Sequence, residues 1–179
     1  MKTVWLLAVA FLGPWAAAAQ SNPPAVTRAA LSALERQFDE ILSRPAQSDA
    51  FDLLGNARGV YLEGYGVVLT AELSLVVAPG LSPFRPALTK TDVENVRARK
   101  ARKLPELKQI MQDMLLAAAS KLVNLPADEQ VAVAVTLSYY SWEDRSGLPA
   151  QVLMQARKKD LIGKTPGASL AASIRQQEY

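Results

Sequence analysis

Residues 130–142 read QVAVAVTLSYYSW, and this stretch decides the fold. Large apolar or aromatic residues stand at every second position up to Tyr139, and small or polar residues stand between most of them. Because the side chains of a strand alternate between its two faces, the pattern predicts a β-strand with one buried face. After the turn-rich residues 143–149, residues 151–158 are expected to pair back onto it as a second strand.

A second hairpin is predicted upstream, over residues 58–78. Valine, leucine and tyrosine recur in this stretch, and Glu63-Gly64-Tyr65-Gly66 interrupts them with two glycines that suit a tight turn. The part after the turn begins VVLTAELSLVV and is too apolar to face water on both sides. We therefore expect a central strand that is covered on at least one face.

Three further segments predict helices. Apolar residues at helical spacing indicate a helix over residues 24–43, with Asn22 as its N-cap. Thr91 and Glu94 fit a capping box at the start of a second helix, which ends near residue 124. Pro105 lies inside that segment and leaves open whether it forms one bent helix or two. A short helix is expected over residues 169–178.

The strands come in hairpins and do not alternate with helices. This order predicts an α+β fold, with an antiparallel or mixed sheet of about four strands (two hairpins) and helices packed on one face. Residues 20–179 are enough for one domain with its own core.

The first nineteen residues predict an export signal. Lys2 precedes the apolar run of residues 4–12, and Ala17 and Ala19 fit a cleavage site of small residues. The run is short for a membrane span, so we expect residues 1–19 to be a cleaved signal peptide, although its retention as an anchor stays open. After its removal we expect no transmembrane span and a periplasmic or secreted location.

The chain has no cysteine and no histidine. A secreted domain without disulfides, and without an N-x-S/T sequon at any of its four asparagines, favours a bacterial source. Zinc sites built from His and Cys and triads built on His are excluded. No dinucleotide, P-loop or calcium-loop pattern is complete, so we expect no cofactor and no metal.

A basic run forms part of the second predicted helix. Six cations fall within twelve residues: Arg97, Arg99, Lys100, Arg102, Lys103 and Lys108. One interpretation is attraction to an anionic lipid or envelope polymer, and the other is a solvated helix face. DNA is not an expected partner, because the chain is predicted to be exported.

The hairpin tip is the second candidate site. Tyr61 and Tyr65 flank a flexible turn and could form a binding rim, or they could cap the edge of the core. A third hypothesis concerns four carboxylates, Glu63, Glu72, Glu143 and Asp144, because glycan hydrolysis needs two carboxyl groups at a set separation.

These patterns leave three functions open. The leading hypothesis is a non-catalytic binding or envelope-associated domain, exported and of bacterial origin. The alternatives are a carboxylate-dependent glycan hydrolase and a subunit of an envelope protein assembly. Another envelope protein is thus a possible partner, and the sequence sets no oligomeric state.

Overall fold

The computed structural model describes residues 25–44, 50–77, 79 and 88–179 of the chain. The predicted signal peptide, residues 1–19, lies outside the described residues, as does the predicted N-cap Asn22. Among the described residues, no helix is both long enough and apolar enough to cross a bilayer.

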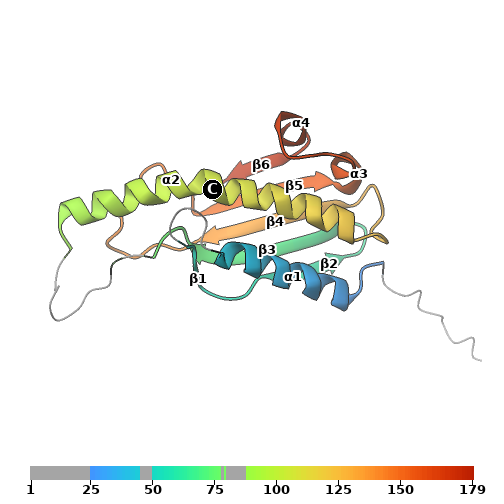
Figure 1. The fold of residues 1–179 in the computed structure, drawn as a ribbon, viewed down its shortest axis with the longest axis horizontal. Coiled ribbons are helices and arrows are strands. Elements are labelled where there is room, and N and C mark those ends of the chain that lie inside the picture. The colour runs from blue at the N-terminus through green and yellow to red at the C-terminus, as the bar shows by residue number, and fades with distance from the viewer. Residues whose placement is uncertain (1–24, 45–49, 78, 80–87) are drawn as a thin grey trace, which may run out of the picture.

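A six-stranded mixed sheet forms one layer of the fold (Figure 1). Its strands are β1 (Asp52–Leu53), β2 (Arg58–Leu62), β3 (Gly66–Ser74), β4 (Gln130–Leu137), β5 (Gln151–Arg157) and β6 (Arg175–Glu178). The order is β1-β3-β4-β5-β6, and β2 pairs with β3 beside β1. Only the pair β3 and β4 is parallel. The structure therefore confirms an α+β fold with a mixed sheet, and it has two more strands than the predicted four.

The register of the sheet separates two faces. Leu69 of β3 lies opposite Val133 of β4, which lies opposite Met154 of β5. All three side chains are fully buried. Because strand side chains alternate, Thr70, Ala134 and their neighbours two residues away point to the other face.

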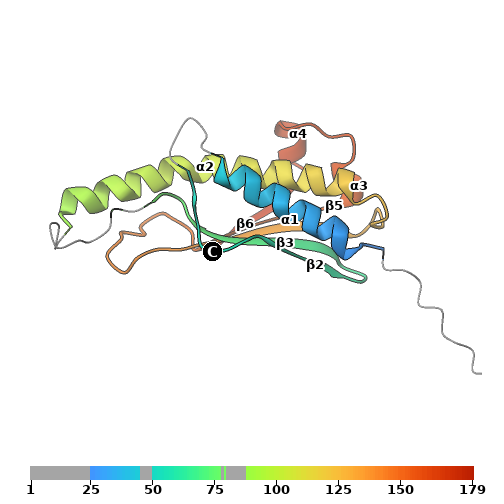
Figure 2. The ribbon, with the colours of Figure 1, turned by 60° about the horizontal axis from the view of Figure 1, so that its bottom comes forward.

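Both long helices cover the same face of the sheet (Figure 2). They are α1 (Arg28–Ser43) and α2 (Lys90–Lys121), and the short helices α3 (Lys158–Leu161) and α4 (Ala168–Ala171) follow later in the chain. Phe38 of α1 and Met111 and Met114 of α2 are fully buried in the core beneath them. None of the described elements covers the opposite face, which we call the bare face.

Helix starts differ from the predicted ones. The hydroxyl of Thr27 accepts a hydrogen bond from the N–H of Ala30 at 3.2 Å, so α1 begins later than residue 24. In α2 the capping box consists of Thr89 and Asp92, and not of Thr91 and Glu94. Both pairs have the same spacing, and only the residue that remains outside the helix can act as the cap.

Helix α2 is continuous through Pro105 and contains 32 residues. The proline therefore neither ends the helix nor starts a new one. The first half of α2 extends beyond the sheet, and the loop that follows β4 reaches beneath it (Figures 1 and 2). This overhang brings the basic run close to residues 138–149.

The C-terminal segment was predicted to be a helix over 169–178, and this prediction was wrong. After the single turn of α4 the chain forms β6, which pairs antiparallel with β5. The N–H of Tyr179 also donates to the carbonyl of Gln151 at 3.0 Å. Pairing with the sheet edge overrides the helical preference of the sequence RQQE, because strand formation depends strongly on its neighbours.

Candidate functional site

Two cations of the basic run are buried inside the fold. Lys100 forms an ion pair with Glu143, and their side chains are only 1% and 2% exposed. The ammonium group of Lys100 also donates to the carbonyl of Ser138 at 3.3 Å and lies 4.4 Å from the ring centroid of Tyr139. Lys100 therefore attaches the overhang of α2 to the loop after β4.

Lys103 has a similar role one turn further along α2. Its side chain is 5% exposed, and its ammonium group lies 2.9 Å from a carboxylate oxygen of Glu106. The same group lies 4.4 Å from the ring centroid of Phe51, which is itself buried. A cation over an aromatic face is stabilised by the ring quadrupole, so Lys103 packs the helix against the segment before β1.

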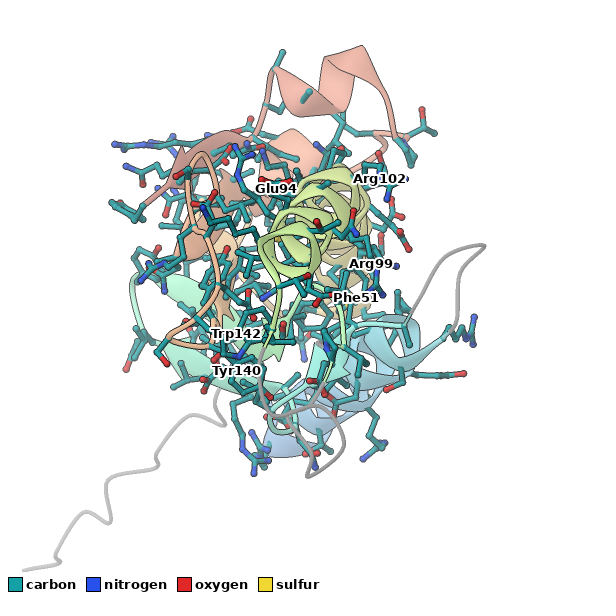
Figure 3. The ribbon with its side chains drawn as sticks, turned by 90° about the vertical axis from the view of Figure 1, so that its left-hand side faces the viewer. Phe51, Glu94, Arg99, Arg102, Tyr140 and Trp142 are labelled. Atoms are coloured by element: carbon teal, nitrogen blue, oxygen red, sulfur yellow. The ribbon has the colours of Figure 1, made fainter. Side chains whose placement is uncertain are left out.

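The other four cations point in several directions. Arg97 donates to the carbonyl of Ser146 at 2.9 Å and lies 3.4 Å from Asp144, whereas Lys108 pairs with Glu178 at 2.7 Å. Arg99 is half-buried and Arg102 is exposed. In the end-on view of α2, these two arginines lie on the side away from Tyr140 and Trp142 (Figure 3).

The structure therefore does not gather the six cations of the basic run on one face. Two of them stabilise the interior and two more contact the loop after β4 or the C-terminal strand. Binding of an anionic lipid or polymer to this helix stays a prediction, and Arg97 and Arg102 are the members of the run that are exposed.

The hairpin tip holds its two tyrosines in different surroundings. The Tyr61 hydroxyl donates to Glu129 at 3.3 Å, and the N–H of Gly64 donates to the same oxygen at 3.2 Å. Burial raises the pKa of Tyr61 above its usual value, and the negative charge of Glu129 adds to this rise. Tyr65 is instead 40% exposed, and its hydroxyl donates to Gln155 on the bare face.

Gly66 fixes the hairpin against β4. Its φ is +131°, and a Cβ at this position would lie 1.9 Å from the carbonyl oxygen of Gln130. Only glycine fits such a close approach of two backbones at this φ. The Tyr61 side of the tip is therefore structural, and the Tyr65 side faces outwards.

The four carboxylates of the hydrolase hypothesis lie in three places. Glu63 is exposed in the hairpin turn, and Glu72 is exposed near the other end of β3. Glu143 is occupied by Lys100. Hydrogen bonds from the side chain and the N–H of Ser146, together with the nearby Arg97, hold the pKa of Asp144 below its usual range.

The bare face divides into two halves. Around the hairpin, Val60, Leu62 and Tyr65 are 47%, 48% and 40% exposed, and we call them the apolar patch. Arg157 of β5, opposite Gln130 in the register, is exposed beside this half of the sheet. Sequence reasoning missed the patch, although the run Val60-Tyr61-Leu62 is apolar at successive positions and therefore places apolar residues on both faces.

The other half of the bare face is polar and hollowed. Two adjoining hollows of about 280 and 90 Å³ share Leu54 as a lining residue. We call them together the polar groove. It lies where the parallel strands β3 and β4 approach their carboxyl ends, a position at which α/β sheets commonly bind ligands.

Carboxylates of α1 hold the outer wall of this groove in place. Glu35 accepts hydrogen bonds from the N–H of Gly59 at 2.7 Å and from Arg28 at 2.6 Å. Asp39 accepts from the N–H of Ala57 at 2.7 Å. Burial tends to raise the pKa of Glu35, but the hydrogen bonds and the charge of Arg28 outweigh it, so the net pKa is lowered.

Comparison with known protein families, with curated proteins and with solved structures gave no match. Among the described residues, no group of three or more acidic side chains is placed to hold a metal ion.

Proposed function

We propose that this chain is an exported, non-catalytic binding domain of the bacterial cell envelope that docks another envelope protein through the apolar patch. The observation that carries the proposal is the sheet itself. Among the described residues, helices cover only one face of the six strands, and large apolar side chains of the hairpin are exposed on the other. Exposed apolar patches on soluble domains commonly mark protein interaction sites.

The composition of the bare face supports a protein partner. Val60, Leu62 and Tyr65 supply an apolar and aromatic centre, and Arg157 of β5 and Arg175 of β6 are exposed. Protein interfaces typically combine an apolar centre that contains aromatics with arginine and a polar rim. Arg157 and Arg175 should therefore face carboxylates of the partner, whereas the exposed Glu63 in the hairpin turn should face a cation.

The distribution of the acids supports a role without catalysis. Glu143 is committed to Lys100, and Asp144 is turned towards Arg97 and Ser146. A two-carboxylate hydrolase needs two carboxyl groups that flank one bond, about 5–10 Å apart. Glu63 and Glu72 lie near opposite ends of β3, so these two residues do not supply such a pair.

Export is part of the proposal and rests on the sequence of residues 1–19. The location we propose is the periplasm or the cell exterior. Fractionation of the producing cell, with the chain recovered from the periplasm or medium and shortened by the leader, is the expected result. Recovery of the uncleaved chain from the cytoplasm would contradict it.

Site-specific crosslinking tests the docking surface. A photoreactive residue at position 62, within the apolar patch, should give one discrete conjugate in the envelope of the producing cell. The same residue at position 36, which is exposed on α1, is the matched control and should not give that conjugate. The charge reversal Arg157→Glu should weaken the conjugate from position 62.

Two results would contradict the proposal. Identical conjugates from positions 62 and 36, or none from position 62, would remove the apolar patch as the docking surface. A conjugate that contains only two copies of this chain would replace the proposed partner by self-association.

A further inference from the structure

Hydroxyl and charged side chains line the polar groove in two neighbouring rows. In the parallel pair, Glu72 of β3 lies opposite Thr136 of β4. Thr70 and Ser74 stand two residues before and after Glu72, and Ser138 follows Thr136 by two. Because the side-chain period of a strand is two, these residues all point to the bare face, on which α1 and α2 do not lie.

The groove contains charges of both signs. Arg58 and Glu72 line the larger hollow, and Asp52 lines the smaller one. Within the part of the chain that the structure describes, neither Arg58 nor Glu72 forms an ion pair. The groove therefore offers a guanidinium donor, carboxylate acceptors and hydroxyls. The hydroxyls of Thr70 and Ser74 donate to the carbonyls of Arg58 and Val76, so they are left as acceptors.

An aromatic pair lies at one end of the groove. Tyr140 lines the smaller hollow and is 54% exposed. Its ring is nearly parallel to that of Trp142, with an interplanar angle of 6° and centroids 5.8 Å apart. Figure 3 shows the two residues together below the end of α2. The buried pair of Lys100 and Glu143 holds the loop that carries them.

We infer that the polar groove binds a neutral oligosaccharide. A sugar ring has an apolar C–H face that packs on an aromatic ring, and its hydroxyls need donors and acceptors at the same time. Ligand sites commonly combine such an apolar or aromatic surface with a few placed polar groups. Two adjoining hollows, with an aromatic pair at one end, suit linked sugars better than a single ring. This site is separate from the apolar patch and does not depend on a protein partner.

The fluorescence of Trp142 can report binding in the groove. The chain has three tryptophans, and replacing Trp5 and Trp15 by phenylalanine leaves Trp142 as the only one. The full chain with these two replacements is titrated with cellotetraose, maltotetraose and chitotetraose while its fluorescence is followed. We expect a saturable change with at least one of the three.

Variants then locate the binding. Tyr140→Ala should lower the affinity about tenfold, which is the loss expected for one aromatic stacking contact. Glu72→Gln, which keeps the shape of the side chain, should also weaken binding, because it replaces a charged acceptor by a neutral amide. Tyr65→Ala is the matched control: it removes an exposed tyrosine from the same face outside the groove, and the affinity should not change.

The same titrations can overturn the inference. Absence of a saturable response to all three tetrasaccharides would do so, as would a response that Tyr140→Ala and Glu72→Gln leave unchanged. An equal loss in Tyr65→Ala would show that binding does not depend on the groove. Because Tyr140, Glu72 and Tyr65 are exposed, the variants should fold, and equal thermal midpoints would establish this. None of these results affects the crosslinking test of the apolar patch.

Discussion

Replacing Lys100 by methionine tests how the overhang of α2 is held. Lys100 and Glu143 are both at least 98% buried at their side chains, and Lys100 is the cation that contacts the Oε2 atom of Glu143. Apart from this ion pair, that oxygen has no hydrogen-bond partner among the described residues. The substitution Lys100→Met keeps the apolar length of the side chain and leaves the carboxylate buried without its cation.

The expected loss of stability is large. Removing one partner of a buried ion pair costs about 3–5 kcal/mol, since the remaining charge is left in a poorly solvated place. A domain has about 5–15 kcal/mol of unfolding free energy in total. At about 2–4 °C for each kcal/mol in a domain of this size, the melting midpoint should fall by roughly 6–20 °C. The lost contact with the Tyr139 ring acts in the same direction.

Urea and thermal unfolding followed by circular dichroism measure this effect. The double variant Lys100→Met with Glu143→Leu should recover most of the stability, because a well-packed apolar pair can replace a buried ion pair without loss. Arg102→Met is the matched control on the exposed side of the same helix and should leave the midpoint unchanged. A loss below about 1 kcal/mol in Lys100→Met would refute the reasoning, since it would mean that Glu143 is solvated.

Three further predictions concern the hairpin, the end of α2 and acid stability. Gly66→Ala should prevent or severely weaken folding, because its Cβ would lie 1.9 Å from a carbonyl oxygen of β4. Gly55→Ala, whose Cβ would have no atom within 4 Å, should be tolerated, and thermal unfolding compares the two variants. Lys158→Met should destabilise the fold by several kcal/mol, because three backbone carbonyls at 2.7–2.8 Å from the ammonium group lose their donor. Lys159→Met changes an exposed side chain and should leave the stability unchanged, and urea unfolding measures both variants. The pKa of Glu35 is lower in the folded chain than its unfolded value of 4.5, so its carboxylate stabilises the fold above that pH, and this contribution is lost as the pH falls through the folded pKa. In Glu35→Gln the free energy of unfolding should therefore fall less steeply in acid, which urea unfolding across a pH series measures.

Each of these predictions has a clear contrary result. Equal midpoints for Gly66→Ala and Gly55→Ala would mean that β3 and β4 are not as close as described. Equal losses for Lys158→Met and Lys159→Met would show that the buried ammonium does not hold the end of α2. If the unfolding free energy of Glu35→Gln fell in acid as steeply as that of the unsubstituted chain, the carboxylate of Glu35 would be no better stabilised in the folded chain than in the unfolded one.

The sequence predicted those parts of the fold that depend on local patterns. The alternation after Gln130 identified β4, and the glycines beside Tyr65 identified the turn between β2 and β3. The parallel pairing of β3 with β4 and the edge strand β6 were not predicted. Both depend on contacts between distant segments, and the residues of β6 have no apolar alternation that would mark a strand.

The candidate site was harder to predict for the same reason. The charges of Lys100 and Lys103 resemble a solvated helix face in the sequence, and nothing local shows that Glu143 and Phe51 meet them in the fold. The bare face depends on which side of the sheet the helices cover. In hindsight the alternating run Thr70, Glu72 and Ser74 is a weak signal for a polar row on a strand, although it does not indicate the partner strand.

The absence of cysteine from the chain makes one measurement decisive for the bare face. Single-cysteine variants at Leu62 and at Arg36 are treated with a membrane-impermeant maleimide, both as purified protein and in the envelope of the producing cell. Both positions are exposed, so both should react when the protein is purified. In the envelope, position 62 should be protected and position 36 should still react. Equal labelling of the two positions in the envelope would contradict docking through the apolar patch.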